Sequence, residues 1–319
     1  MFFLCLAAIG AFLLYKVGAS DFDWSVFLTS LRDVQPAWLA ASIAATMLTY
    51  VARALRWQVL LTPLKYVRMG PLISSNILGF SAIYLLGRAG ELVRPIWLTR
   101  MEQVPLTASL ATVIVERFLD LFMVIAMFGL ALVFVELPSA ADETVAALKN
   151  GAMVIAAVSV TAMVFLYFFR ARIERITRFV PFEKVRALLK SFGEGLSFLD
   201  RGTTFGLVIA HSALVWGTIA IQFWFMLLGM NFQFSIAAAT LVMVGVAIGS
   251  IAQIPVIGGG FQLAYIFCMT TFFAVPLEQA TATALLAGIL SYVPTVLAGG
   301  LYMISHGLSL KDLRTATAE

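Results

Sequence analysis

Long apolar segments separated by short polar loops make up most of the chain. Many of these segments approach or exceed the roughly 20 residues that an α-helix needs to cross the hydrocarbon core of a bilayer. The pattern predicts an all-α, polytopic integral membrane helical bundle that forms a single domain over residues 1–319. We expect roughly six to eight crossings of the membrane. The predicted spans are 2–17, 37–61, 71–87, 108–135, 150–169, 204–228, 236–252, 261–275 and 279–304.

The composition agrees with this pattern. Apolar residues make up 61% of the chain and charged residues only 12%, whereas a soluble protein carries about a quarter charged residues. The net charge of +4 does not indicate a nucleic-acid partner, because cytoplasmic loops of membrane proteins are rich in Lys and Arg. The first apolar segment has no basic leader, so we expect a retained helix and not a cleaved signal peptide.

The charges of the loops predict how the chain is oriented. The loops 18–36 and 136–149 carry mainly acidic residues and should lie outside the cell. The loop 62–70 and the segment 170–202 are basic and should be cytoplasmic, as should both termini. The segment 170–202 also contains apolar residues, so it either lies along the membrane surface as an amphipathic connector or is a plain basic linker between two halves.

The segment "GRAGELVRP" (87–95) raises a question about the number of membrane crossings around it. The loops on either side of 71–135 are assigned to opposite faces, yet two apolar segments lie between them. One segment must therefore return to its own side, and we expect 71–100 to be re-entrant from the cytoplasm. Charged, non-helical backbone at membrane depth is tolerated only where protein or a water-filled cavity surrounds it.

The second half of the chain has a comparable break. The short segments 236–252 and 261–275 are separated by "QIPVIGGGF", and they form either two thin crossings or one re-entrant hairpin. Paired short segments interrupted by Gly and Pro are typical of inverted-repeat transporters with a site near the midplane. The residues expected to act in gating at this break are Gln253, Pro255, Gly258, Gly259, Gly260 and Gln262.

Three groups of ionisable residues fall within or beside the apolar spans. An isolated charge in a membrane costs about 2.5–3.5 kcal/mol by insertion scales, so a cluster of charges indicates a function. Together the groups contain five arginines and three acids, a surplus of two positive charges. The planar guanidinium group of arginine is suited to bidentate binding of phosphate or carboxylate. We therefore predict an intramembrane cavity that binds the anionic or polar headgroup of a lipid. The candidate binding residues are Arg53, Arg56, Arg88, Glu91, Arg94, Glu116, Arg117 and Asp120.

Each group also has a simpler interpretation. Arg53 and Arg56 would bury only the aliphatic part of their side chains and extend their guanidinium groups to the cytoplasmic interface. The residues 116–120 would form a purely structural ion-pair cluster, since Glu116 and Asp120 are spaced i, i+4 and Arg117 can reach Asp120. The residues 88–94 would form an ordinary cytoplasmic loop. The six tryptophans are expected to mark interfaces and packing and not a ligand cage.

Four motifs, "RALRW", "GRAGELVRP", "ERFLDL" and "IPVIGGGF", resemble the lysylphosphatidylglycerol synthase transmembrane-region family over nearly the whole chain. This flippase-like family includes hopanoid- and glycolipid-associated members. The resemblance implies re-entrant helices, a cavity open to lipid and movement of lipids between leaflets. Family members usually carry an acid after the glycine-rich break, where this chain has Gln262, so any role of that acid in proton relay or headgroup coordination is absent or altered here.

The leading expectation is a lipid translocator of the bacterial inner membrane that is not an enzyme and uses no cofactor. No Walker motif and no metal-spaced His/Cys cluster is present. The 319 residues contain no segment that resembles the aminoacyl-transfer domain of the full-length synthases, so we do not expect this chain to make the aminoacylated lipid. The expected partners are the bilayer, a phospholipid, glycolipid or hopanoid substrate, and either a second copy or a lipid-biosynthesis protein. The alternatives are a lipid-carrier transferase with Glu91 or Asp120 as base, and a non-catalytic partner of a lipid-modifying enzyme.

Overall fold

The computed structural model describes residues 22–135, 202–254 and 258–307, together with scattered positions between 147 and 186. The predicted span 2–17, most of 150–169 and of the connector 170–202, and both termini lie outside the described residues. The same is true of Pro255 and of the side chains of Arg88 and Gln253.

The described chain is helical apart from one pair of two-residue strands, which confirms the predicted fold class. Seven predicted spans match helices to within three residues at each end. Five of the described helices, α3, α4, α6, α9 and α12, are long and apolar enough to cross a membrane. The elements in chain order are α2 (Trp24–Arg32), α3 (Pro36–Leu61), α4 (Met69–Leu86), η1 (Gly87–Leu92), α5 (Val93–Glu102), α6 (Leu106–Phe134), α9 (Gly202–Gly229), α10 (Ile236–Gly249), η3 (Ser250–Ala252), β1 (Gln253–Ile254), β2 (Gly258–Gly259), α11 (Gly260–Phe273) and α12 (Leu277–Ser305).

The helices α3 and α9 form the most extensive helix pair, and small polar residues bring them together. Ser42 on α3 donates to the backbone oxygen of Gln222 at 3.0 Å, and Thr49 bonds Thr218 at 3.1 Å. Small residues at such an interface let two helix backbones approach closely, which is the usual basis of helix packing in membranes. The buried stripe of α3 continues from this interface to Arg53 and Arg56.

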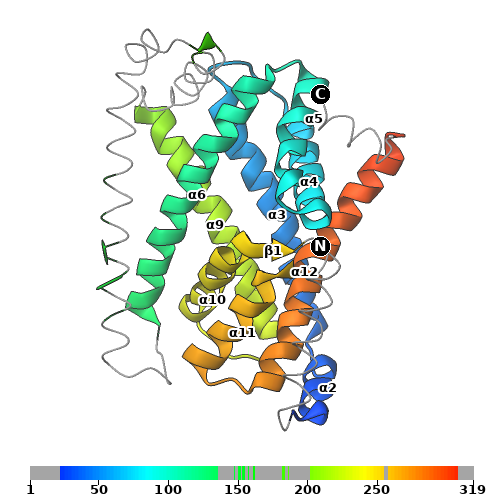
Figure 1. Ribbon diagram of the computed structural model, residues 1–319, viewed down its shortest axis with the longest axis vertical. Helices are drawn as coiled ribbons and strands as arrows, with labels where there is room; N and C mark the ends of the chain where they lie inside the picture. The colour runs from blue at the N-terminus through cyan, green and yellow to red at the C-terminus, as the bar shows by residue number, and fades with distance from the viewer. Residues whose placement is uncertain are drawn as a thin grey trace.

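Two helical hairpins lie at opposite ends of the molecule (Figure 1). The helices α4 and α5 pack side by side in the upper half of the view, and α10 and α11 pack side by side in the lower half. The tip of the first hairpin is η1, and the tip of the second contains η3, β1 and β2. The tips are in contact through η1 and β1. The charged segment and the glycine-rich segment of the sequence therefore meet in the middle of the fold.

The short helices of these hairpins limit how they can sit in a bilayer. At 1.5 Å per residue, the 14-residue helices α10 and α11 are each about 21 Å long. This is less than the roughly 30 Å of a hydrocarbon core. The two helices pack against each other and are joined at the middle of the fold, so the segment forms a helical hairpin.

Close backbone packing in the first hairpin requires glycine at position 90. A Cβ atom added to Gly90 would lie 2.3 Å from backbone atoms of Ala82 and Ile83. We expect Gly90→Ala to lower the free energy of unfolding by about 3 kcal/mol, because main-chain atoms cannot move aside. Gly70→Ala, in the same hairpin with no atom within 4 Å, should be neutral or stabilise by up to about 1 kcal/mol. Thermal unfolding in detergent measures both, and equal stability of the two variants would contradict this packing.

Candidate functional site

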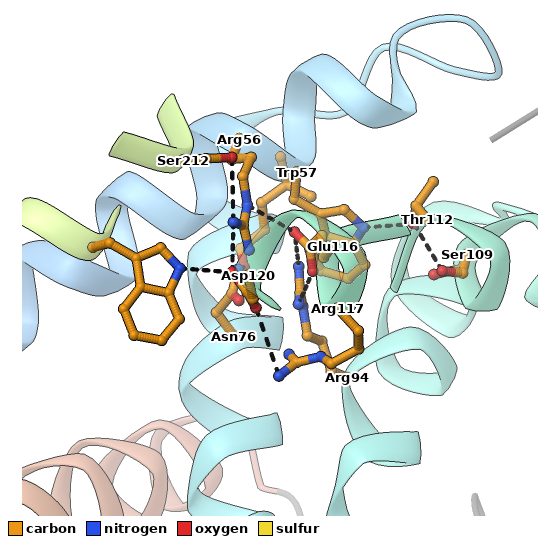
Figure 2. A network of polar contacts seen from close by, with 12 residues as sticks. Arg56, Trp57, Asn76, Arg94, Ser109, Thr112, Glu116, Arg117, Asp120 and Ser212 are labelled. Atoms are coloured by element: carbon orange, nitrogen blue, oxygen red, sulfur yellow. Dashed lines mark hydrogen bonds and ion pairs between the residues drawn. The ribbon is translucent and has the colours of Figure 1, made fainter. Parts of the chain in front are cut away.

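The predicted charged residues of α3, α5 and α6 form a continuous ion-pair network (Figure 2). Arg94 makes a bidentate contact with Glu116, in which Nη2 donates to Oε1 at 3.0 Å and Nη1 donates to Oε2. Arg56 donates from Nη1 to Oδ1 of Asp120 at 2.7 Å, and its Nε lies 3.6 Å from Oε1 of Glu116. Arg117 completes the chain of contacts, with Nη1 3.6 Å from Oδ2 of Asp120. The predicted reach of Arg117 to Asp120 is confirmed.

Tryptophan and small polar side chains hold this network from several sides. Trp57 stacks beneath Arg94, whose Cζ lies 3.8 Å from the ring centroid, and donates to Thr112 at 2.9 Å. Trp216 on α9 donates from Nε1 to Oδ1 of Asp120 at 3.1 Å. The network is therefore tied to four helices, and its side chains have little freedom to rearrange.

Arg53, Arg56 and Arg94 are buried inside the protein. Arg56 and Glu116 are fully buried, and Arg94 is nearly so. Arg53 is also buried, with only 8% of its surface exposed. The alternative in which Arg53 and Arg56 extend their heads to the cytoplasmic interface therefore does not describe these side chains. Residues 87–92 form a 3₁₀ helix and Arg94 belongs to the next helix, so the segment 88–94 is not a single regular α-helix.

A cavity of about 380 Å³ lies beside the network. Residues of both hairpin tips line it, including Glu91 on η1, Ile251 on η3 and Phe261 at the start of α11. Its polar and charged lining residues are Thr46, Thr49, Tyr50, Arg53, Tyr84, Glu91, Arg117, Asp120, Trp216, Gln222, Ser250, Ser291 and Tyr292.

Arg53 differs from the paired arginines. It lines the cavity, and its Cζ lies 4.6 Å from the centroid of the Phe80 ring, which fixes the guanidinium plane. Its buried Nη1 has no hydrogen-bond partner among the described residues. A buried charge is normally paired and hydrogen-bonded, because its desolvation is costly. Arg53 thus contributes a fixed cation to the cavity lining, with one donor that the described residues do not use.

The structure divides the eight predicted binding residues into two sets. Arg56, Arg94 and Glu116 form the buried network behind the cavity, whereas Arg53, Glu91, Arg117 and Asp120 line the cavity itself. For Arg88 the structure describes only the backbone, within η1.

The second predicted group lies around the tip of the α10–α11 hairpin. Gln253 pairs with Gly259 in the two-residue strands, Gly258 lies in β2, and Gly260 begins α11. Gln262 is half-buried on α11, and its Oε1 has no hydrogen-bond partner among the described residues.

Several lining residues were missed by reasoning from the sequence. Tyr50, Gln222 and Tyr292 lie in long apolar helices, where a single aromatic or amide residue gives little signal. Trp216 was expected to mark packing or an interface, and it instead donates to Asp120. Tyr50 offered one hint, because it precedes Arg53 by one helical turn.

Comparison with known proteins confirms the resemblance seen in the motifs. The family model described as lysylphosphatidylglycerol synthase TM region matches residues 3–299. Among curated proteins, none matches the chain.

Proposed function

The chain belongs to the lysylphosphatidylglycerol synthase TM region family, and on this premise we propose that it translocates a lipid whose anionic or polar headgroup binds in the arginine-lined cavity. Membership implies a multi-pass membrane protein associated with lipid metabolism or transport. The observation that carries the finer proposal is Arg53, a buried cation that lines the cavity and whose Nη1 has no hydrogen-bond partner among the described residues.

The cavity reaches the apolar outer surface of the bundle. Three of its lining side chains, Leu121 on α6, Ile248 on α10 and Ile251 on η3, are 57%, 59% and 69% exposed. Exposed apolar side chains on a membrane bundle contact lipid tails. A volume of about 380 Å³ is at the lower end of the range for small-molecule sites, about 300–1,000 Å³. It suits a headgroup, while the acyl chains stay in the bilayer beside α6 and α10.

The hairpin tips supply a means of movement. Both tips line the cavity, and they contact each other through η1 and β1. We propose that both hairpins are re-entrant, from opposite faces of the bacterial inner membrane, with both termini cytoplasmic. Broken helices at a central site let two halves of a transporter rock around it. A displacement of one tip against the other would alter access to Arg53.

A transferase is less well supported by the geometry. Asp120, one of its two candidate bases, accepts hydrogen bonds from Arg56 and Trp216 and lies 3.6 Å from Arg117. Donors and cations around a carboxylate favour its ionised form and weaken it as a proton acceptor. We therefore propose a function without chemical change of the lipid.

Purified protein in liposomes that contain a fluorescent phospholipid tests this function. Loss of fluorescence after addition of a membrane-impermeant quencher reports the fraction of lipid in the outer leaflet. We expect quenching beyond one half when the protein is present. Chemically altered lipid in the same vesicles would instead indicate a transferase. Quenching that stops at one half with unaltered lipid would contradict translocation and favour a non-catalytic partner.

A further inference from the structure

The cavity has a second polar wall, made of uncharged described residues that do not belong to the ion-pair network. Tyr292 and Ser291 of α12 and Gln222 of α9 contribute to it. Gln222 donates from Nε2 to Oγ of Ser291 at 3.4 Å, and Tyr50 shares a hydrogen bond of 2.8 Å with Thr295, one turn along α12. Hydroxyl and amide groups of this kind both donate and accept hydrogen bonds.

Tyr292 is the group in this wall that the protein leaves unused. Its ring is fixed between Tyr84, at 4.4 Å between centroids, and Phe261, at 5.3 Å. Its hydroxyl is buried and has no hydrogen-bond partner among the described residues. Buried tyrosine hydroxyls usually have a partner. A fixed ring with an unused hydroxyl at a cavity wall is suited to a ligand that brings its own polar atoms.

Arg53 and Tyr292 lie on two neighbouring parts of one lining. Arg53 is one turn from Tyr50 on α3, Tyr50 bonds Thr295, and Thr295 is one turn from Tyr292 on α12. The lining of the cavity thus contains both a guanidinium group and an uncharged hydroxyl. The carboxylate of Asp120 is already held by Arg56 and Trp216, so this carboxylate is not a ready site for a cationic headgroup.

Building on the proposed translocation, we infer that the ligand is a phosphodiester lipid whose headgroup is an uncharged polyol, a glycerol or a sugar. Its phosphate binds at Arg53, and its hydroxyl groups bind at Tyr292 and the Gln222–Ser291 pair. Each hydroxyl of the ligand can both donate to and accept from this wall. A phosphate ester that lacks headgroup hydroxyls would satisfy Arg53 and leave Tyr292 unpaired.

Two monoanionic probes with identical short acyl chains isolate this difference: phosphatidylglycerol and phosphatidylethanol. Native mass spectrometry of the protein in a neutral detergent measures the binding of each. We expect phosphatidylglycerol to bind about two- to tenfold more tightly, the equivalent of roughly one net hydrogen bond. Tyr292→Phe should remove this preference and leave phosphatidylethanol binding unchanged. Tyr265→Phe is the matched control, because Tyr265 is a buried phenol whose oxygen lies near the Met230 sulfur, and it should keep the preference.

The outcomes separate this inference from the proposed function. Equal binding of the two probes by the wild-type protein, or a preference that survives Tyr292→Phe, overturns the polyol assignment. If Arg53→Gln still weakens both probes in that case, the anion site of the proposed function stands. If neither probe binds, or if Arg53→Gln weakens neither, the anion site fails and the polyol assignment fails with it.

Discussion

Replacement of Glu116 by glutamine is expected to lower the free energy of unfolding by about 3–5 kcal/mol, the usual cost of removing one partner from a buried ion pair. Glu116 is fully buried and receives both guanidinium arms of Arg94, with Arg56 Nε at 3.6 Å. Glutamine has nearly the same size but no charge, so Arg94 loses its main counter-ion and Arg56 loses the second of its two. The loss comes from the uncompensated arginines and not from a cavity.

A peripheral pair supplies the control for this prediction. Glu102 lies 3.6 Å from the Lys65 ammonium group, whose side chain is largely exposed. Glu102→Gln should cost less than about 1 kcal/mol, because solvent screens such pairs. The combined variant Glu116→Gln/Arg94→Gln should be less destabilised than the sum of its single variants, because it removes both charges of one pair. Thermal unfolding in detergent measures each variant. A Glu116→Gln protein as stable as Glu102→Gln would show that the network does not hold the helices together.

Arg53→Gln is expected to slow lipid movement by roughly 10- to 150-fold. This range corresponds to the loss of one hydrogen bond to a charged group, about 1.5–3 kcal/mol. The same change should leave the stability of the protein unchanged or raise it. Arg53 Nη1 is buried without a hydrogen-bond partner among the described residues, so removing the charge relieves a desolvation cost. Lost activity with retained stability is the expected result for a residue kept for binding.

The quenching assay in liposomes and thermal unfolding together check this prediction. Arg68→Gln is the matched control, because Arg68 is exposed at the start of α4. It should move lipid at the wild-type rate. If Arg53→Gln moves lipid as fast as Arg68→Gln, the guanidinium is not part of the transport path. If Arg53→Gln unfolds instead, Arg53 has a structural role like that of Glu116.

The periodicity of the chain was sufficient to predict the helices but not how their charges are used. Helix ends follow from local signals, such as Pro105 before α6 and Ser235, which caps α10 by accepting from Ala238 at 3.2 Å. Whether Arg53 is buried depends on Phe80 and on the other helices around the cavity, far away in sequence. The motif spacing alone could not decide between a buried and an interfacial side chain.

The residues that line the cavity could likewise be predicted only in part from the sequence. Glu91 and Asp120 could be selected because charges are rare in apolar spans. Tyr292 and Gln222 could not, because uncharged polar residues are common in membrane helices and many simply bond their own helix or a neighbour. Their grouping depends on α9 and α12 packing around α3, which is a tertiary property. The contact of Arg117 with Asp120 could be predicted from its i, i+3 spacing, but the bidentate contact between α5 and α6 could not.

The central claim is that the phosphate of a membrane lipid binds to Arg53 inside the bundle. Its most direct test is electron cryo-microscopy of the protein in nanodiscs of anionic phospholipid. We predict a lipid phosphate within hydrogen-bonding distance, about 3 Å, of Arg53 Nη1, with the acyl chains leaving the cavity beside Leu121 and Ile248. An Arg53 side chain paired to an acid of the protein, with lipids confined to the outer surface of the bundle, would contradict it.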